Sequence, residues 1–364
     1  MRRQLTRDDV EPAVLGGALL GGGGGGHLEE GRAFGELAVL LGEVELWTLD
    51  ELQEGDLLAT AGLVGAPAAR EGHVAPADHV RAAQVLQGAL GAPIRGIVTN
   101  EMGPFATVNG WLQAAMLAVP VVDAPCDGRA HPTGVMGAAG LHRQMGYVSL
   151  QAAVGGRGER RIEAMLRGPL AAAAAGVRAL SVAAGGLVAV ARNPVSAAYA
   201  KEHCALGAVG EAMALGAVAL EHRGAVGEAL AAALMEHLGG EICGLGEVTD
   251  VRLETVGGFD VGLATVGDLE LSFWNEYMTL ERRGRRLGTF PDLIATLDLA
   301  SGLPLATADL QTGRRVAVVR VPKERLRLGA GVRDPELLRA VEAAIGREVV
   351  RYACATDGAG AAGG

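Results

Sequence analysis

The sequence is poor in aromatic residues and has no paired cysteines. Only 3% of its 364 residues are Phe, Trp or Tyr, although 49% are hydrophobic. Its hydrophobic core must therefore be built mostly from Ala, Val and Leu. The cysteines are widely separated and include no CxxC pair, so we expect free thiols rather than a disulfide framework. They are Cys126, Cys204, Cys243 and Cys354.

The sequence also lacks an excess of positive charge and a long apolar span. Its 32 Lys and Arg are outnumbered by 42 Asp and Glu, and the formal net charge is −10 at pH 7. A nucleic-acid partner is not expected, because phosphate binding needs a basic face. The stretch most like a membrane span, 169–190, is interrupted by Arg178 and several glycines. No apolar signal region follows the charged first residues, so we expect a cytoplasmic protein without a membrane partner.

Strand and helix patterns alternate through the first part of the chain, as in a parallel sheet with crossover helices. The patterns predict helices over 7–20, 28–41, 76–90 and 104–117, and strands over 44–47, 57–61, 94–99 and up to Asp123. An alanine-rich, mostly helical region over 160–238 contains one strand at 186–191. Short apolar alternations over 246–321 predict strands, and a helix follows over 335–345.

These patterns predict an α/β protein of two domains. Residues 1–165 would form an N-terminal parallel-sheet α/β domain that carries the glycine-rich loop and the Cys126 loop. Residues 166–350 would form a mixed helical and β-rich C-terminal domain, and residues 351–364 a flexible tail. A chain of this length is long enough for two domains.

The segment after the strand that ends at Asp123 concentrates reactive side chains. It holds the Cys126 thiol, the Asp123 and Asp127 carboxylates, the Arg129 guanidinium and the His131 imidazole. Cys126 is a candidate nucleophile, because nearby positive charge lowers the pKa of a thiol below about 8.5. His131 could carry the proton, and Asp123 or Asp127 could orient it. The alternative is a buried structural thiol, and spacing alone does not decide between the two.

Six consecutive glycines, 21–26, precede His27. Consecutive backbone N–H groups can bind phosphate, but the run follows a helix and lacks the Gly-Lys-Ser/Thr of a nucleotide loop. We therefore favour a loop that approaches an active-site wall closely, with Gly25, Gly26 and His27 lining the site. A solvated loop position is the alternative for His27.

Further polar residues interrupt or end apolar segments. Asn100 and Glu101 end a predicted parallel strand, where ligands gather in open α/β sheets, although the pair would also suit a helix start. Glu276 follows the apolar run 271–274 and could reach into a cleft or face outward. Arg192 could bind a substrate carboxylate or simply end a strand. A metal site made by His27, His131, Asp123 and Glu101 would have to be assembled by the fold, and spacing gives it little support.

Several motifs occur in a specific order and spacing. They are Leu5-Thr6, the glycine run, Gly65-Ala66-Pro67, Asn100-Glu101-Met102-Gly103, Asn109, residues 123–132, Phe273-Trp274-Asn275-Glu276-Tyr277 and Pro291-Asp292-Leu293-Ile294. In this order the chain resembles the S-methyl thiohydantoin desulfurase family, from about residue 5 to residue 322. The resemblance implies an N-terminal α/β domain and a C-terminal domain with a substantial β part. It also implies hydrolysis of an S-methylated thiohydantoin to methanethiol and a hydantoin, in the breakdown of S-methylated ergothioneine.

The resemblance suggests roles for the candidate residues. The Cys126 thiolate would attack the sulfur-bearing ring carbon, and water activated by His131 or a carboxylate would hydrolyse the adduct. Asp123 and Glu101 would bind the ring N–H groups, and Arg129 or Arg192 the propionate tail. Substrate-binding positions would also include Asn100, Asp127, Glu276, Gly25, Gly26 and His27.

Three other functions stay open at this point. The chain could be a metal-dependent hydrolase of a hydantoin-like ring, a non-catalytic partner subunit of a hydantoinase-like enzyme, or a nucleotide-binding protein. No cofactor is required by the sequence, and a divalent metal remains an open alternative. We expect a small-molecule substrate and a homo-oligomer.

Overall fold

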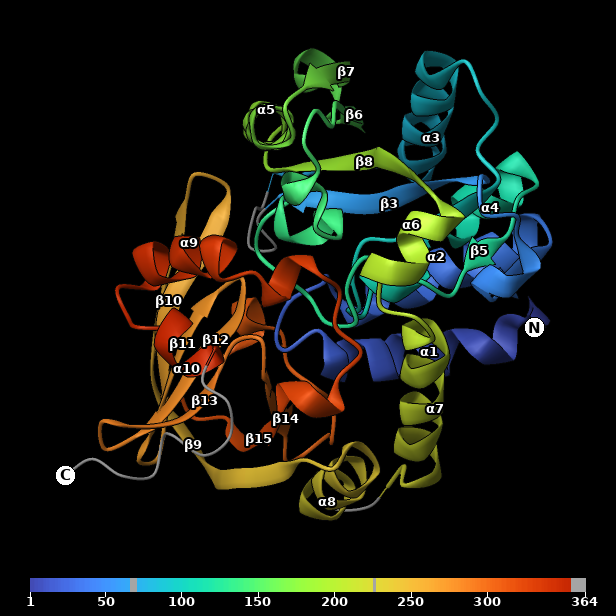
Figure 1. Cartoon of the computed structure of the whole chain (residues 1–364). Coiled ribbons are helices and arrows are strands. Elements are labelled where there is room, and N and C mark those ends of the chain that lie inside the picture. The colour runs from blue at the N-terminus through green and yellow to red at the C-terminus, as the bar shows by residue number, and fades with distance from the viewer. Residues whose placement is uncertain (66–70, 225–226, 355–364) are drawn as a thin grey trace.

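The structure is a computed structural model that describes residues 1–65, 71–224 and 227–354, and it contains two β-sheets (Figure 1). The first sheet has the order β1-β2-β5-β4-β3-β8-β6-β7. Its strands are β1 Arg2–Leu5, β2 Val44–Trp47, β3 Leu57–Gly65, β4 Gly96–Thr99, β5 Val121–Val122, β6 Ser149–Gly155, β7 Ile162–Gly168 and β8 Leu187–Ser196. Strands β2, β5, β4 and β3 run parallel, and every other neighbouring pair is antiparallel.

The predicted α/β class is confirmed, although the first sheet is mixed rather than wholly parallel. The alternating strands and helices of the first 125 residues form its parallel centre, as expected for crossover connections. Strand β8 pairs antiparallel with β3 and β6, and it comes from beyond residue 165. The sheet therefore extends past the domain division expected from the sequence.

The helices cover the sheets and fill the space beside them. They are α1 Arg7–Leu20, α2 Leu28–Leu41, α3 Pro76–Leu90, α4 Trp111–Leu117, α5 Leu170–Ala183, α6 Ala197–His203, α7 Ala208–Glu221, α8 Gly227–Leu238, α9 Pro335–Ile345 and α10 Val350–Ala353. The predicted ranges of α1, α2, α3 and α9 are confirmed. Helix α1 begins where Thr6 and Asp9 form a capping box, with the Thr6 N–H donating to Asp9 Oδ2 at 2.8 Å.

Two predictions about helix and tail need correction or restriction. The helix expected over 104–117 begins only at Trp111, because Gly110 has a φ of +130° and the N–H groups of Phe105 and Ala106 donate to the Gly25 carbonyl instead of within a helix. Of the tail expected over 351–364, residues 351–353 belong to α10, and residues 355–364 lie outside the described residues. Two residues of the Gly65-Ala66-Pro67 motif, 66 and 67, also lie outside them.

The second sheet confirms the predicted β-rich region and is antiparallel throughout. Its order is β13-β12-β11-β10-β9-β15-β14. Its strands are β9 Glu241–Val256, β10 Phe259–Val266, β11 Leu269–Trp274, β12 Glu276–Arg282, β13 Arg285–Thr289, β14 Leu293–Asp298 and β15 Arg315–Val321. Leu271, Phe273, Tyr277 and Val318 belong to one buried cluster of this sheet.

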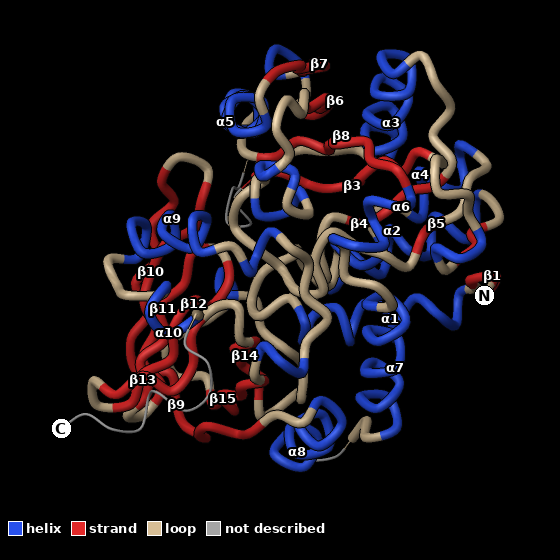
Figure 2. Tube along the Cα trace, in the orientation of Figure 1, coloured by secondary structure: helices blue, strands red, loops and turns tan. Residues whose placement is uncertain are grey.

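Helices and loops connect the two sheets, and many loops converge between them (Figure 2). Helices α1 and α7 approach so closely that a Cβ on Gly16 would lie 1.7 Å from the Ala212 carbonyl oxygen. The loop after α1 then meets the second sheet, because the Gly22 carbonyl accepts from the Tyr277 N–H at 2.9 Å. This contact places the glycine run beside the start of β12.

No single helix among the described residues is long enough and apolar enough to span a membrane. One bent pair, α6 with α7, passes a test of length and composition only.

Candidate functional site

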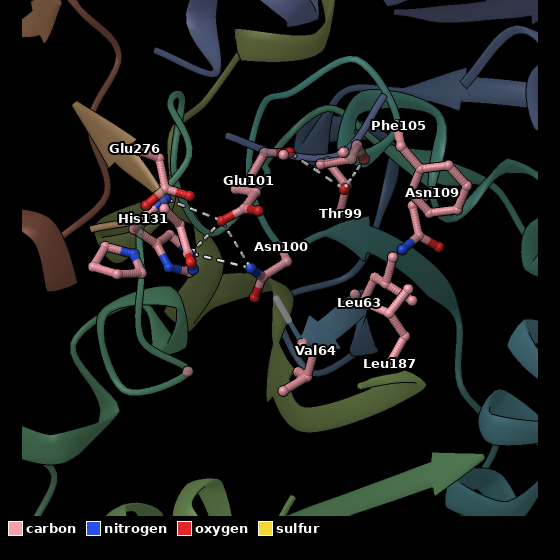
Figure 3. A pocket seen from close by; sticks show the side chains of 18 of the residues that line it. Leu63, Val64, Thr99, Asn100, Glu101, Phe105, Asn109, His131, Leu187 and Glu276 are labelled. Carbon is pink, nitrogen blue, oxygen red and sulfur yellow. Dashed lines mark hydrogen bonds and ion pairs between the residues drawn. The ribbon is translucent and has the colours of Figure 1, made fainter. Parts of the chain in front are cut away.

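A cavity of about 320 Å³ lies where the carboxyl ends of β3 and β4 meet the second sheet. Both sheets contribute to its lining, with residues 62–65 from β3, 99–101 at the end of β4, the loop 131–134, and 275–276 at the start of β12. Polar side chains gather at one end, whereas Leu63, Phe105 and Asn109 lie at the other (Figure 3). The cavity lies at the strand ends, where a ligand site is expected in an open α/β sheet.

Glu101, His131 and Asn100 form a hydrogen-bonded cluster at the polar end (Figure 3). Glu101 Oε2 accepts the backbone N–H of His131 at 3.1 Å and lies 3.2 Å from His131 Nε2. The Asn100 amide nitrogen lies 3.1 Å from the same ring nitrogen and 3.3 Å from Glu101 Oε2. These contacts fix the carboxyl and the imidazole of two distant loops at one point.

Arg192 determines which ring nitrogen of His131 carries the proton. Its Nη2 donates to Asn100 Oδ1, so the Asn100 NH₂ group must face His131 and Glu101. With the amide in this orientation Nε2 of His131 accepts, and the neutral ring carries its hydrogen on Nδ1, which has no hydrogen-bond partner among the described residues. In this tautomer Nε2 can receive a proton from Glu101 but cannot donate one to it.

The protonation states of Glu101 and His131 are both shifted by burial. Burial raises the pKa of Glu101 to about 7, although the His131 N–H and the charge of Arg192 oppose the rise. Burial, together with the charge of Arg192, lowers the pKa of His131 to about 3. Near neutral pH the ring is uncharged and Glu101 exchanges its proton readily, which suits a general base.

Gly137 leaves the space that the His131 ring occupies. A Cβ at Gly137 would lie 2.2 Å from His131 Cε1 and 2.3 Å from Nε2, which is far inside contact distance. The φ of Gly137 is −78°, so its backbone would accept another residue. The His131 ring and Asn100 Oδ1, which would lie 2.7 Å from the added Cβ, are what require a glycine here.

Two arginines supply positive charge to the cavity. Arg192 is 2% exposed, and its Nε has no hydrogen-bond partner among the described residues. Arg178 of α5 donates to the carbonyls of Gly258 and Pro132, and its guanidinium lies 4.0 Å from the centre of the Phe259 ring. Burial lowers the pKa of both arginines, that of Arg178 to about 10, so both remain charged at neutral pH.

Glu276 enters the cavity from the second sheet, opposite Glu101 (Figure 3). The side chain is 2% exposed, and its Oε2 has no hydrogen-bond partner among the described residues. Burial, with the nearby charge of Glu101, raises the pKa of Glu276 well above its ordinary value. The structure therefore places Glu276 in the cavity lining rather than on an outward face.

The glycine run forms part of the cavity wall and leaves no room for side chains. A Cβ at Gly24 would lie 2.2 Å from Glu276 Oε1, and one at Gly25 would lie 2.5 Å from the Cα of Gly103. Gly25, Gly26 and His27 line the cavity as expected. His27 Nδ1 also lies 3.3 Å from Asp309 Oδ2, so this histidine links the loop to the C-terminal part of the chain.

Comparison with known proteins identifies the family. The model of the S-Me-THD-like N-terminal domain matches residues 8–160, and that of the S-Me-THD-like C-terminal domain matches residues 171–332. The chain belongs to the S-Me-THD-like family, that of the S-methyl thiohydantoin desulfurases. No curated protein matches it.

A solved structure shares the fold of this S-Me-THD-like protein. It is an X-ray crystal structure of a protein from Chromobacterium violaceum, 21% identical, with a TM-score of 0.69. The match covers 94% of this chain and 96% of that chain. At this identity the likeness supports the architecture alone.

Cys126 of this S-Me-THD-like protein lies outside the cavity lining, which corrects the expected placement beside Glu101 and His131. The thiol is 4% exposed, and its Sγ lies 3.3 Å from Thr60 Oγ1. A hydrogen bond with Cys204 lowers the pKa of Cys126, with smaller contributions from Thr60 and the charge of Arg192. Thr60 pairs with Arg192 across β3 and β8, so these two side chains lie on the same face of the sheet, and the charge of Arg192 acts on the thiol although Cys126 is not part of the lining.

Asp123 is also outside the lining, because it caps a helix. Its two carboxylate oxygens accept the N–H groups of Val209 and Gly210 in the first turn of α7, at 2.8 and 3.1 Å. A carboxylate occupied in this way holds α7 against the end of β5 rather than orienting His131.

Asp127 and Arg129 are fully buried and connect distant parts of the chain. Asp127 Oδ1 accepts the N–H of Gly329 at 3.0 Å, and burial raises its pKa well above the ordinary value. Arg129 donates to the Asp292 carbonyl, and its guanidinium lies 4.5 Å from the centre of the Phe290 ring. The roles expected for these two in substrate binding are corrected to structural ones, since neither lines the cavity.

Some lining residues had no functional assignment from the sequence. Arg178 interrupts an alanine-rich stretch, which drew attention only to membrane character, and Thr133 lies in a loop with no pattern. Asn109 had appeared only within the ordered motifs. The only hint in the sequence was that Asn109 follows Phe105 within the predicted helix 104–117, in the part that lies outside α4 in the structure.

The side chains of the cavity do not fit a resident metal ion. Within 1–65, 71–224 and 227–354, no group of three or more His, Cys, Asp or Glu side chains is placed to hold one. The set His27, His131, Asp123 and Glu101 is divided, because Asp123 caps α7 and His27 pairs with Asp309. Structural metal sites usually need four such ligands, and catalytic sites three.

Proposed function

We propose that this protein hydrolyses the C–S bond of an S-methyl thiohydantoin, with Glu101 as the base that activates water. The observation that carries this proposal is the Glu101 carboxyl, whose side chain is 14% exposed and which lines the cavity, contacts His131 and has a pKa of about 7. A base with this pKa is matched to neutral pH. Membership of the S-Me-THD-like family supports the thiohydantoin substrate class.

Water attack on the ring carbon is the central step. The carbon that bears the S-methyl group is an electrophilic amidine-type carbon, and ionised Glu101 removes a proton from the water that attacks it. A C–O bond forms, the C–S bond breaks, and the sulfur leaves as methanethiol once protonated. The ring keeps the water oxygen as a carbonyl, which makes it a hydantoin. His131 holds the Glu101 carboxyl through its backbone N–H during this transfer.

Arg192 and Arg178 orient a substrate that carries a carboxylate. Both line the cavity and are charged, and Arg192 keeps an unpartnered Nε among the described residues. A guanidinium binds a carboxylate through two parallel hydrogen bonds, which fixes direction as well as position. The propionate group of an S-methyl thiohydantoin propionate is the natural occupant of this end of the cavity.

A covalent adduct on Cys126 is the alternative route to the same products. The lowered pKa of its thiol favours a nucleophile, but the thiol lies outside the lining and contacts Thr60. Attack would require the thiol to reach a substrate from outside the cavity lining. We therefore favour direct attack by water.

The test is thiol release from S-methyl thiohydantoin propionate, with the hydantoin product followed by mass spectrometry. Wild type and Glu163→Gln, whose exposed carboxylate pairs with Arg81, should both release methanethiol. Glu101→Gln should bind the substrate and turn it over roughly 10²–10⁴-fold more slowly, as expected when a general base is lost. A wild-type protein that binds this compound without releasing methanethiol would support the non-catalytic subunit instead.

A further inference from the structure

We propose that Glu276 is the general acid of this site and delivers the proton that the departing sulfur needs. The proposal rests on the proposed function, in which Glu101 takes a proton from water. It goes further by dividing the two carboxyl groups of the cavity into a base from the first sheet and an acid from the second.

The turn before β12 fixes the direction of Glu276. Asn275 adopts a φ of +58°, a left-handed conformation that Asn tolerates better than most residues. Its N–H donates to the Asp260 carbonyl at 2.7 Å, and its Oδ1 accepts the Asp260 N–H at 2.9 Å. Trp274 and Glu276 are direct partners across the turn, so the Glu276 side chain has a fixed origin at the cavity wall.

The glycine run confines the Glu276 carboxyl but forms no hydrogen bond with its second oxygen, Oε2. Glu276 Oε1 lies against Gly24, since a Cβ on Gly24 would be 2.2 Å from this oxygen. Oε2 has no hydrogen-bond partner among the described residues although the residue is 2% exposed. A buried carboxyl with one free oxygen in a ligand cavity is placed to give a hydrogen bond to a ligand.

The surroundings separate the two carboxyl groups by protonation state. Arg129 and Arg178 favour ionised Glu276, but burial and the charge of Glu101 outweigh them, so its pKa lies well above the ordinary value. Glu101 has a pKa of about 7, and its charge is one of the causes that raise the pKa of Glu276. Two carboxyl groups close together in a site with little solvent exposure cannot both ionise easily, and different environments then assign one as base and the other as acid.

The proton balance of the reaction closes with these two groups. Glu101 accepts one proton from the attacking water, the second water proton passes to the ring nitrogen that was doubly bonded to the reacting carbon, and Glu276 gives its proton to the sulfur as the C–S bond breaks. The products are methanethiol, a hydantoin carbonyl, protonated Glu101 and ionised Glu276. Transfer of one proton from Glu101 to Glu276 through solvent restores the starting state, so no other reactant is needed.

The experiment compares leaving groups in Glu276→Gln. An S-methyl thiohydantoin releases a basic thiolate that needs a proton, whereas an S-(4-nitrophenyl) thiohydantoin releases a weakly basic thiolate that does not. Glu276→Gln keeps the size and one hydrogen-bond donor of the side chain. We expect kcat on the S-methyl substrate to fall about 10²–10⁴-fold, the range for loss of an acid catalyst, and kcat on the S-aryl substrate to stay near wild type.

The alternative outcomes distinguish this proposal from the proposed function. Equal losses on both substrates would overturn the acid role and make Glu276 a ring-binding residue, while thiol release by wild type would leave the proposed function intact. No thiol release by wild type from either compound would contradict the proposed function itself. The thermal unfolding of Glu276→Gln, measured alongside, separates a catalytic loss from a misfolded variant, and Glu276→Asp should recover part of the S-methyl activity.

Discussion

Glu101 Oε2 lies 3.2 Å from His131 Nε2, and the two groups are held as a neutral imidazole beside a carboxyl that ionises near neutrality. The contact explains how a carboxyl at the end of β4 can work as a base. The ring cannot give Glu101 a proton, because its Nε2 already accepts from Asn100. Glu101 is therefore the group whose ionisation should control turnover.

The pH dependence of kcat/KM should follow the ionisation of Glu101. A base must be ionised and an acid protonated, so kcat/KM should rise with pH through a pKa of about 7 and fall again at higher pH, where Glu276 ionises. In Glu101→Gln the rise of kcat/KM with pH should be missing, and most of the activity should be lost. Thiol release measured across the pH range checks both, and a wild-type limb near the ordinary carboxyl value would contradict the role.

The same ionisation should oppose folding. The folded pKa of Glu101 is raised above its unfolded value, so the stability it contributes is present at low pH and is lost as pH rises through the interval up to about 7. Glu101→Gln cannot ionise and should not show that loss. Denaturant unfolding of the two proteins between acid and neutral pH measures the difference, and parallel curves would contradict it.

Gly137→Ala should impair catalysis more than stability. The added Cβ would lie 2.2 Å from His131 Cε1 and must displace the ring, while its backbone conformation suits Ala. A displacement of about 1 Å at a reacting group can cost roughly 10²-fold in rate. Gly168→Ala, which has open space at its Cβ, is the matched control. Unchanged kcat/KM and pH profile in Gly137→Ala would show that the ring position is not needed.

The position of the site was predictable where backbone rules decide it. Parallel strands end at one edge of a sheet, so Asn100 and Glu101 could be placed in a ligand site from their position after an apolar strand. Glu276 stood out as a carboxyl that ends an apolar run. The glycine run was correctly taken as a close-approach wall, because it lacks the residues of a nucleotide loop.

The direction of each side chain in the 123–132 loop was not predictable. Five reactive groups within ten residues suggested one site, yet only His131 lines the cavity. Asp127 accepts a hydrogen bond from the Gly329 N–H, and Arg129 donates one to the Asp292 carbonyl. Each partner lies more than 150 residues further along the chain. Spacing cannot reveal partners so distant in sequence. Arg178 was missed for the same reason, and the expected homo-oligomer and cytoplasmic location stay predictions.

Cys126→Ala should retain turnover. Its thiol contacts Thr60 and lies outside the cavity lining, so its loss should cost about 1–2 kcal/mol of stability at most and little activity. Cys354→Ala, at an exposed thiol, is the control. Rates of thiol release and the mass of the protein quenched during turnover check this. A folded but inactive Cys126→Ala, with a substrate adduct on wild type, would establish the covalent route.

Gly25→Ala should destabilise the protein, because both its backbone and its surroundings require glycine. Its φ is +78°, and a Cβ would lie 2.5 Å from the Cα of Gly103, which is backbone and cannot swing aside. Strain of this kind costs about 1–3 kcal/mol. Because Gly25 lines the cavity, substrate affinity should fall as well.

Gly88→Ala provides the opposite expectation within the same chain. Gly88 lies inside α3 with nothing near its Cβ, so the substitution should stabilise the protein by roughly 0.5–1 kcal/mol through the lower flexibility of the unfolded chain. Denaturant unfolding of the two variants and of wild type measures the expected loss of stability in Gly25→Ala and the expected gain in Gly88→Ala. Equal stabilities for Gly25→Ala and Gly88→Ala would mean that the glycine run can move to accommodate a side chain. The loop would then confine the Glu276 carboxyl less tightly than the close contacts of Gly24 and Gly25 indicate.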